Sequence, residues 1–498
     1  MINSFSMRNA VKPLALAVTA ALVLQGCAIP DIQTRDAQVA LPSNYQSSLS
    51  SEHVKIDWNE WFEDPHLIEL IDTALANNQE VAMMLQRINM AANEVYAREG
   101  EYLPSVSAGA EAETGKVGEY TRDGAVEEQL HIREDKDFPD PLANLRLGLN
   151  ASWELDVWHK LRDASKVASL EYLASIESRQ FFITEMVAEV AKTYYELLAL
   201  DNHLSNLDAT IALQKNVLNT IQKLKQFGRS SSLPVARFNA EVNKNLSERY
   251  IVQQEIVETE NKLNLLLGRA PQHIERDADQ LMSAKLHKPA AGVPSELLTN
   301  RSDIREAELE LAAAKLNISV AKANFYPSFA LHAGIGLEAF DAKYLFNTPE
   351  SVAYSLSGDI FAPLINRRAI EAQYKDASAA QIQAAYEYEY TIVRAVSEVS
   401  SGLSKLDNLN NSFALKSKQI EALDQSVDVA NKLFASARGE YLEVLLAQRE
   451  SLEAKNALID TRKEQLTALV ELYQSLGGGW KEAVSENANL TGIDKNTG

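Results

Sequence analysis

The chain of 498 residues is 46% hydrophobic and 23% charged, which is the composition of a folded protein rather than a disordered one. Its 48 Lys and Arg against 69 Asp and Glu give a formal charge of −21, which argues against a nucleic-acid-binding protein, because such a protein presents cations to phosphate. Its single cysteine excludes an intrachain disulfide framework and any metal site built from several cysteines.

The N-terminal residues 1–26 are predicted to be a signal peptide. A basic start precedes an apolar run at 14–24, which at about 11 residues is too short to span a bilayer. The run ends in Leu-Gln-Gly-Cys at 24–27, which resembles the lipobox of bacterial lipoproteins. The resemblance implies that the Cys27 thiol is lipidated before cleavage, and the neutral Ala28 implies sorting to the outer membrane. An ordinary signal peptide followed by an unmodified cysteine is the alternative.

The remaining chain contains an internal duplication. The segment Tyr102–Ser105 recurs as Phe325–Ser328, and each copy leads into alternating residues and then into a tract nearly free of Gly and Pro. Repeats of about 200 residues are too long for a solenoid. We expect a lipidated N-terminal linker at 27–57, a first structural repeat at 58–268, an inter-repeat equatorial segment at 269–294, a second repeat at 295–480 and a C-terminal tail at 481–498.

Each repeat is predicted to begin with one helix and to end with two very long ones. Helical spacing covers 66–100, behind Asp64-Pro65, and its counterpart covers 295–324. In the long tracts apolar residues recur every seven positions, as at Val242, Ile256 and Leu263, and at Leu445, Leu452, Ile459, Leu466 and Tyr473. This period favours coiled-coil packing. An isolated coiled coil explains the heptads equally well.

Four segments between the helices alternate with a period of two and are predicted to be strands. They lie around Val106–Ala112, Leu145–Trp153, Phe329–Leu337 and Val352–Ser357, the last being the shortest. One face of each is apolar and the other is small, polar or charged, at lengths near the roughly ten residues of a membrane-spanning strand. Trp153 and Tyr354 lie near strand ends, where interfacial aromatic residues belong. A sheet packed on a soluble core is the alternative.

Four such strands cannot close a barrel alone. Each unpaired peptide group in lipid costs several kcal/mol, and the smallest closed barrels have about eight strands. We therefore expect the chain to share a barrel with copies of itself. Three copies would supply twelve strands and also twelve helical columns around a hollow cylinder.

Several separated motifs occur in one order along the chain. They are Trp153-Glu-Leu-Asp156 with Lys160-Leu-Arg162, Asn300-Arg-Ser-Asp303, the run from Tyr441 to Arg449, and the ending Leu476-Gly-Gly-Gly-Trp480. Together they resemble the TolC-like outer-membrane factors, specifically the lipoprotein branch that serves resistance–nodulation–division efflux systems. The resemblance covers 58–480. It implies an α+β membrane protein, a trimeric 12-stranded β-barrel with four strands per protomer, continued into a long periplasmic α-helical barrel.

The implied function is the outer-membrane channel of a tripartite efflux pump, a passive exit duct for drugs or other small molecules. The implied partners are two further copies of the chain, a periplasmic adaptor (membrane fusion) protein, an inner-membrane resistance–nodulation–division pump and outer-membrane lipids. A duct for type I protein secretion and a lipid-anchored coiled coil without a pore are the alternatives. No catalytic or phosphate-binding motif is present, so we expect neither an enzyme nor a cofactor beyond the lipid on Cys27.

Two reversals of the helical tracts are candidate contact sites. Gly228 is predicted to adopt a positive φ after the first long helix, with Ser231 or Ser232 as a helix N-cap. The second reversal lies at 437–440. The resemblance implies that these turns meet the adaptor, and it assigns that role to Gly228, Ser231, Leu233, Ala437, Gly439 and Leu442. Turns that serve only to reverse the chain are the alternative.

The resemblance also implies an aperture just beyond the second reversal. Glu443 matches an acidic position that forms a constriction ring in some relatives, and Leu446 stands at the next ring position. Three carboxylates crowded on a three-fold axis would repel one another and hold cations. The gate would therefore be one charged ring over an apolar one. A solvated glutamate on a helix face is the alternative.

Overall fold

The computed structural model describes residues 29–42, 44–45, 58–133, 136–285, 292–436 and 438–478. The predicted signal peptide, Cys27, Ala437 and the predicted tail at 481–498 lie outside these residues. The chain forms two compact units, and each contains segments of both repeats. The first is Met1–Asp36, Asn89–Leu173 and Leu309–Tyr386; the second is Ala37–Ile88, Ala174–Glu308 and Glu387–Gly498.

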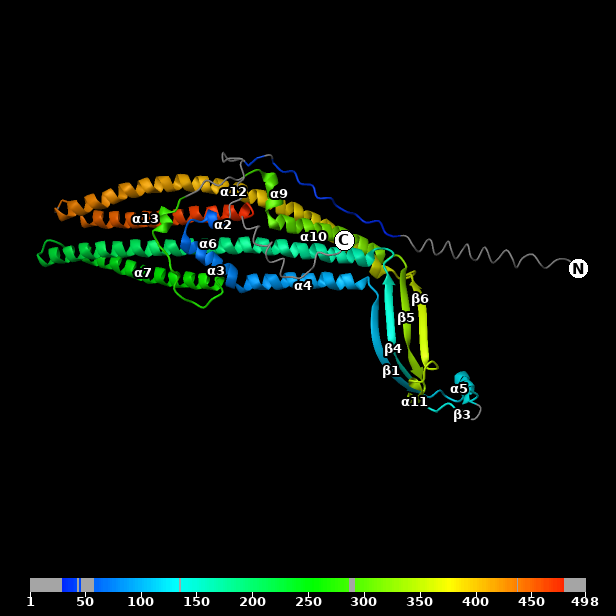
Figure 1. Cartoon of the computed structure of the whole chain (residues 1–498). Helices are drawn as coiled ribbons and strands as arrows, with labels where there is room; N and C mark the ends of the chain where they lie inside the picture. Colours follow the sequence, from blue (N-terminus) through cyan, green and yellow to red (C-terminus); the bar gives the residue numbers. More distant parts are fainter. Residues whose placement is uncertain are drawn as a thin grey trace. The chain divides into compact units, whose positions relative to one another are not determined.

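The first unit contains an antiparallel sheet of four strands in the order β1-β4-β5-β6 (Figure 1). Their bounds are Ser105–Gly115 (β1), Leu142–Leu155 (β4), Ser328–Ala339 (β5) and Val352–Phe361 (β6). All four predicted strands are present, and the α+β class is confirmed. The fourth strand is longer than predicted: it continues past Ser357 to Phe361 because it pairs with β5 along its whole length.

The loops that join these strands carry small elements of their own. Between β1 and β4 lie α5 (Arg122–Glu127), β2 (His131–Arg133) and β3 (Lys136–Asp137), and between β5 and β6 lies α11 (Ala342–Leu345). The Phe138 and Phe340 rings meet edge-on, with centroids 5.2 Å apart, so the two loops pack against each other. Period-two reasoning did not predict these short elements.

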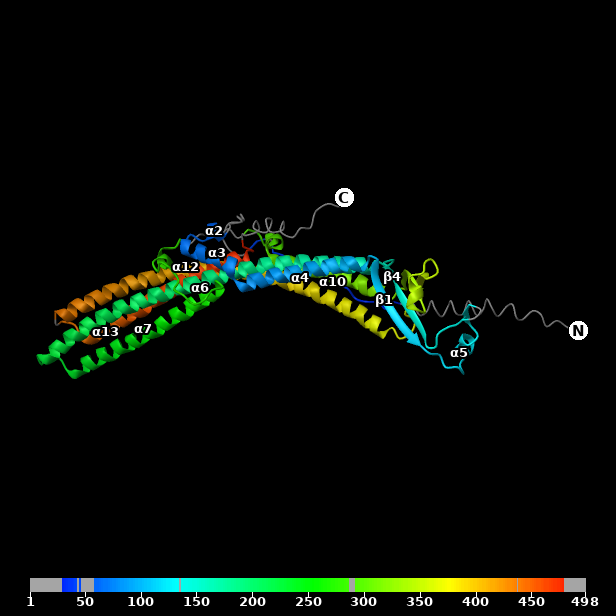
Figure 2. The ribbon, with the colours of Figure 1, turned by 60° about the horizontal axis from the view of Figure 1, so that its bottom comes forward.

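Four long helices dominate the second unit. They are α6 (Lys160–Gln226), α7 (Ser232–Leu266), α12 (Arg368–Ala435) and α13 (Tyr441–Ser475); α6 and α12 begin in the first unit. In both views α6 lies beside α7 and α12 lies beside α13, so each pair is a helical hairpin (Figure 2). The heptad residues Leu452, Ile459, Leu466 and Tyr473 are buried, as the seven-residue period predicts. Among the helices of the described residues, none combines the length and the apolar character needed to cross a membrane.

The predicted single helix at the start of each repeat is wrong. The first is two helices, α3 (Pro65–Asn77) and α4 (Gln79–Glu101), separated by the extended residue Asn78. Asn78 Oδ1 accepts the backbone N–H groups of Glu80 and Val81 at 2.7 and 3.2 Å, and its Nδ2 donates to the Leu266 carbonyl at 2.8 Å. The Asn78 side chain therefore caps the start of α4. Its hydrogen bond to Leu266 holds the chain extended at a position where the helical spacing of apolar residues continues without a break.

The second repeat is interrupted at the same place. The stretch predicted as one helix at 295–324 contains η1 (Pro294–Glu296), α9 (Leu297–Asn300) and α10 (Ser302–Ala323). The intervening Arg301 is extended, with φ −90° and ψ 123°, and its guanidinium is buried. It donates to Asp303 at 2.7 and 2.9 Å and to Glu398 at 2.6 Å. A buried ion network therefore replaces the asparagine cap of the first repeat.

A glycine packs against each of these breaks. Gly268 follows α7 with φ +66°, and a Cβ at this position would lie 2.4 Å from the Asn77 carbonyl oxygen. Gly477 follows α13 with φ +100°, and its Cβ would lie 2.5 Å from the Asn300 oxygen. Both repeats therefore contain the same backbone contact in the second unit. In each, a glycine just after the helical hairpin packs against the carbonyl group at the break in the first helix.

Gly268→Ala tests this contact against Gly228→Ala. Gly228 also has a positive φ, +69°, but nothing lies within 4 Å of the position its Cβ would take. We expect Gly228→Ala to lower the free energy of unfolding by about 1 kcal/mol, the cost of the left-handed conformation. Gly268→Ala should cost roughly 2–4 kcal/mol because overpacking is added. Thermal unfolding followed by the circular-dichroism signal of the helices measures both effects. Equal decreases in stability for the two variants would contradict the close contact at Gly268.

Candidate functional site

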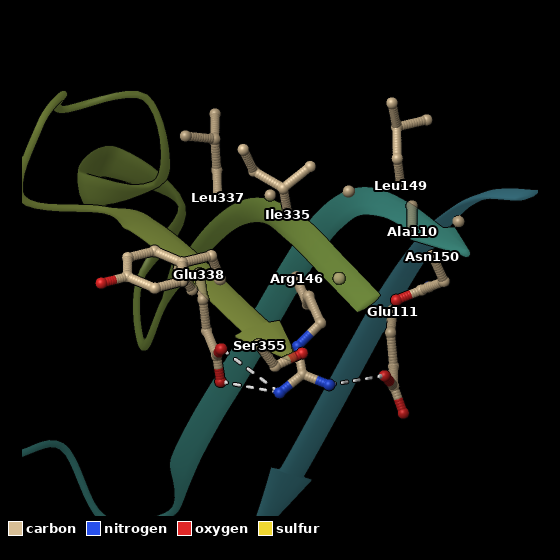
Figure 3. A pocket seen from close by; sticks show the side chains of 15 residues that line it. Ala110, Glu111, Arg146, Leu149, Asn150, Ile335, Leu337, Glu338 and Ser355 are labelled. Atoms are coloured by element: carbon tan, nitrogen blue, oxygen red, sulfur yellow. Dashed lines mark hydrogen bonds and ion pairs between the residues drawn. The ribbon is translucent and has the colours of Figure 1, made fainter. Parts of the chain in front are cut away.

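The strand register divides the sheet into two chemically different faces. Glu111, Arg146 and Glu338 lie directly opposite one another across β1, β4 and β5 and share one face. The Arg146 guanidinium donates to the two Glu338 oxygens at 3.1 and 3.2 Å and lies 3.8 Å from a Glu111 oxygen, as Figure 3 shows. This triad is exposed, so it contributes charge to the face rather than much stability.

A row of glycines crosses the same face beside the triad. Gly109, Gly148 and Gly336 occupy facing positions in the register. A Cβ at Gly148 would lie 2.7 Å from the Ile335 carbonyl oxygen, and one at Gly336 would lie 2.4 Å from that of Leu147. A larger residue at Gly148 or Gly336 would force the backbones of β4 and β5 apart, whereas nothing lies within 4 Å of a Cβ at Gly109. The glycines leave a hollow of about 210 Å³ next to Arg146 (Figure 3).

The other face of the sheet is apolar and exposed. Leu149, Ile335 and Leu337 point away from the triad in Figure 3. Ile335 is 60% exposed, and Leu356 and Tyr354 of β6 are 80% and 84% exposed. A sheet packed on a soluble core would bury this face, so the soluble-core alternative is wrong. An exposed apolar face opposite a polar one is typical of a strand set in lipid.

The sheet has two open edges. β1 and β6 each pair with one strand only among the described residues. Near one strand end, the Trp153 indole N–H donates to the Tyr102 carbonyl at 3.0 Å. Because unpaired backbone groups are not tolerated in lipid, a sheet of this kind requires further strands at both edges.

The first hairpin reverses at Gly228, as predicted. The N–H of Gly228 donates to the Lys225 carbonyl at 2.9 Å and that of Arg229 to the Leu224 carbonyl at 2.8 Å, which is a Schellman turn. Ser231 has the extended backbone of an N-cap residue, but its side chain makes no capping hydrogen bond. Leu233 is 55% exposed. The adaptor-contact role of this turn stays a prediction.

The second hairpin reverses differently. Gly439 does not adopt a positive φ; a Cβ there would lie 2.9 Å from Leu433 Cβ, so this glycine allows a close approach to the end of α12. The N–H groups of Arg438 and Gly439 both donate to the Leu433 carbonyl, at 2.9 and 3.1 Å. Leu442 is half-buried in the first turn of α13. The two reversals therefore use glycine for two different physical reasons.

The two predicted aperture residues lie on the first turns of α13. A Glu443 carboxylate oxygen accepts the backbone N–H of Glu440 at 3.3 Å, which caps the start of the helix. Glu443 is exposed, and Leu446 is 45% exposed. The structure therefore gives Glu443 a local helix-capping role, which the sequence reasoning missed although the Glu-x-x-Glu spacing is compatible with a capping box. Its place in a charged ring stays a prediction.

Polar side chains link α6 to α13 along the two hairpins. His203 Nε2 lies 2.9 Å from Asp460 Oδ1, and the Asn206 amide donates to Asn456 at 2.7 Å. Burial lowers the pKa of His203, but the hydrogen bond and charge of Asp460, together with Asn456, raise the pKa of His203 above its ordinary value. The same hydrogen bond lowers the pKa of Asp460.

The predicted lipidation residue, Cys27, lies outside the described residues, but the segment that follows it docks on the first unit. Ile29 and Ile32 pack against a buried cluster that contains Phe325 and Tyr374. The Gln381 amide accepts the Arg35 backbone N–H at 3.0 Å and donates to the Arg35 carbonyl at 2.6 Å. We name residues 29–36 the N-terminal strap. Sequence reasoning placed them in a linker and missed this docking.

No metal-binding group was found in the described parts of the chain. In these parts, no three His, Cys, Asp or Glu side chains are grouped so that they could hold one ion.

Long helical hairpins and an amphipathic sheet with open edges define the fold of an outer-membrane efflux channel. The solved open-state MtrE channel of Neisseria gonorrhoeae superposes with a TM-score of 0.76 at 23% identity, over 91% of this chain and 98% of that one. A family model described as outer membrane efflux protein matches residues 70–269 and 293–478. The chain belongs to the outer membrane efflux protein family.

Curated relatives align along nearly their whole length. A solvent efflux pump outer membrane protein, SrpC of Pseudomonas putida, is 29% identical over 95% of this chain and 99% of its own. The cation efflux system protein CusC of Escherichia coli O6:H1 is 28% identical over 93% of this chain and 98% of its own. The relatives therefore share the architecture but differ in the cargo that their names give.

The His203–Asp460 pair predicts a pH-dependent stability. Since the pKa of His203 is raised on folding, its stabilisation is complete below the unfolded value of about 6.5 and is lost as the pH rises through the folded value. We expect His203→Asn to lower the melting temperature more at pH 5.5 than at pH 8.5. The lowered pKa of Asp460 removes its contribution only in stronger acid.

Asn245→Ala is the control, because the Asn245 amide donates to the neutral Gln214 at 2.9 Å, between α6 and α7. This variant should lower the melting temperature by the same amount at both pH values. A pH-independent effect of His203→Asn would contradict the assigned shift.

Proposed function

We propose that three copies of the chain form a passive outer-membrane duct in a tripartite efflux pump. The observation that carries this proposal is the four-stranded sheet with one exposed apolar face, one polar face and two open edges. Pairing β6 of one copy with β1 of the next satisfies both edges, and three copies give the twelve strands expected from the sequence. The apolar faces then meet lipid and the polar faces line the duct.

The duct carries small molecules and selects weakly among them. Its polar face is built mainly from Ser, Gly and Asn, with Glu111, Glu338 and Asp359 outweighing Arg146. Such a surface offers water-like contacts and a negative potential, which favours neutral and cationic solutes. Relatives named for solvent and cation efflux support a broad range of cargo on this architecture.

The helical reversals contact a periplasmic adaptor, and an inner-membrane resistance–nodulation–division pump supplies the energy. Exposed apolar side chains at the first reversal, Phe227 at 78% and Leu233 at 55%, support a docking role there. Ser231, Ala437, Gly439 and Leu442 complete the proposed contact set with Gly228.

A lipid on Cys27 anchors the mature chain to the outer membrane. The N-terminal strap supports this role, because its Ile29 packs against the buried cluster that contains Phe325, which lies just before the start of β5 at Ser328. The mass of the mature protein reports on the modification.

Planar-bilayer recording tests the duct. Protein purified from outer membranes should be a trimer and should give ion-conducting channels with no requirement for nucleotide. A folded monomer, or a trimer that gives no conductance, would contradict the proposal and would favour a lipid-anchored coiled coil without a pore.

Two substitutions at Glu443 separate an aperture charge from a helix cap. Glu443→Gln keeps an oxygen that can accept the Glu440 N–H but removes the charge, so we expect unchanged thermal stability and a weaker preference for cations. Glu443→Ala should weaken the preference equally and also lower the melting temperature. Reversal potentials in a KCl gradient measure the preference. If Glu443→Gln leaves the reversal potential unchanged, Glu443 serves the helix and not the aperture.

A further inference from the structure

A cavity of about 450 Å³ lies where the sheet of the first unit joins its helices. Its walls come from the last residues of β4 and β6, the turn between α10 and β5 with the first residue of β5, and the segments that lead into α6 and α12. Its volume falls in the range of small-molecule pockets, about 300–1,000 Å³. Neither the predicted adaptor contacts nor the predicted aperture includes any of its residues.

A rigid aromatic pair forms one wall of the cavity. The Trp158 and Tyr326 rings stack with centroids 4.7 Å apart and an interplanar angle of 26°. The Trp158 indole N–H donates to the Pro327 carbonyl at 2.7 Å, which fixes the orientation of the ring. Trp158 nevertheless remains 43% exposed. A stacked pair that is held in place and still open on one side presents a ready surface to a flat ligand.

A third aromatic ring projects from the polar face of the sheet. Phe361 pairs with Ser328, which puts it on the same face as His332, Ser357 and Arg146. It is 71% exposed on a face whose other residues, apart from Leu142 at the start of β4, are small, polar or charged. Packing against lipid does not explain it, because the lipid-facing residues lie on the opposite side. Ile360, the preceding residue, is equally exposed there.

The charged groups at the cavity favour some ligands over others. Glu154 lies 3.8 Å from Lys160, so these two charges largely offset each other. The Asp156 carboxylate also lines the cavity, where it accepts the backbone N–H groups of Leu161 and Arg162 at 2.9 and 3.0 Å and so caps α6. The remaining charge is negative, which disfavours an anion.

We infer that this cavity binds planar aromatic molecules, neutral or cationic, as they pass along the duct. The inference rests on the proposed function, since the polar face is the wall of the duct only if three copies close the barrel. Stacking on Trp158 and contact with Phe361 supply the attraction, and the open side of the cavity lets the ligand leave. Binding is therefore weak and brief, as transport requires.

Ethidium, a planar aromatic cation, is the probe in planar-bilayer recordings of the full-length trimer. We expect it to cause brief interruptions of the current. Phe361→Ala should shorten their mean duration roughly threefold to tenfold, as expected for the loss of one aromatic contact. Ile360→Ala is the matched control, since it removes an equally exposed apolar side chain from the other face, and it should leave the duration unchanged. The anionic aromatic 8-anilinonaphthalene-1-sulfonate should interrupt the current far less.

The outcomes separate this inference from the proposed function. Absence of conductance contradicts the duct itself. Normal conductance with ethidium interruptions that are equally long in wild type and Phe361→Ala overturns the aromatic site, and so does an equal effect of Ile360→Ala. If Phe361→Ala does not assemble, Phe361→Leu keeps the side-chain volume without the ring and should shorten the interruptions in the same way.

Discussion

The requirement that every backbone hydrogen-bonding group be paired in lipid governs this structure. A sheet of four strands satisfies its interior and leaves β1 and β6 with one neighbour each. In water the open edges could be hydrated. One face of the sheet, however, exposes apolar residues of β5 and β6, and contact of this face with water is unfavourable. A single copy of the sheet therefore leaves backbone groups unpaired at both edges and an apolar face uncovered. Only an assembly of several copies pairs the edges and separates the apolar face from the polar face that carries the glycine row.

The two repeats reach the same packing through different chemistry. In one repeat an asparagine amide caps the helix break, and in the other a buried arginine joins Asp303 and Glu398. Yet Gly268 packs against the Asn77 carbonyl in nearly the same way as Gly477 packs against the Asn300 carbonyl, and each carbonyl belongs to the residue just before the break. The hairpin reversals diverge similarly, with a Schellman turn at Gly228 and a close backbone approach at Gly439. The position of a backbone contact therefore survived duplication better than the side chains that support it.

The strands and hairpins could be predicted because each has a strong period. Side chains alternate across a strand, so the faces of β1 and β4 follow directly from the sequence, and the heptad residues of α13 are buried as expected. The breaks at Asn78 and Arg301 could not be predicted, because helical spacing continues through both. Besides its nearer partners, each residue bonds a carbonyl more than a hundred residues away: Asn78 bonds that of Leu266 and Arg301 bonds that of Ser475. The cap at Glu443 is a local contact that the Glu-x-x-Glu spacing could have indicated, whereas the aromatic cavity depends on contacts that no local pattern encodes.

The N-terminal strap has a consequence for how its sequence can vary. Gln381 holds Arg35 through the main chain, by one N–H and one carbonyl, and Ser378 donates to the Gln33 carbonyl at 2.5 Å. Interactions of this kind do not read side-chain identity, so most replacements in the strap leave them intact, while a proline at position 35 would remove the donor. These hydrogen bonds therefore place little restriction on the side chains at Gln33 and Arg35, whereas packing restricts Ile29 and Ile32, and Gln381, far along the chain, cannot change without the loss of two bonds.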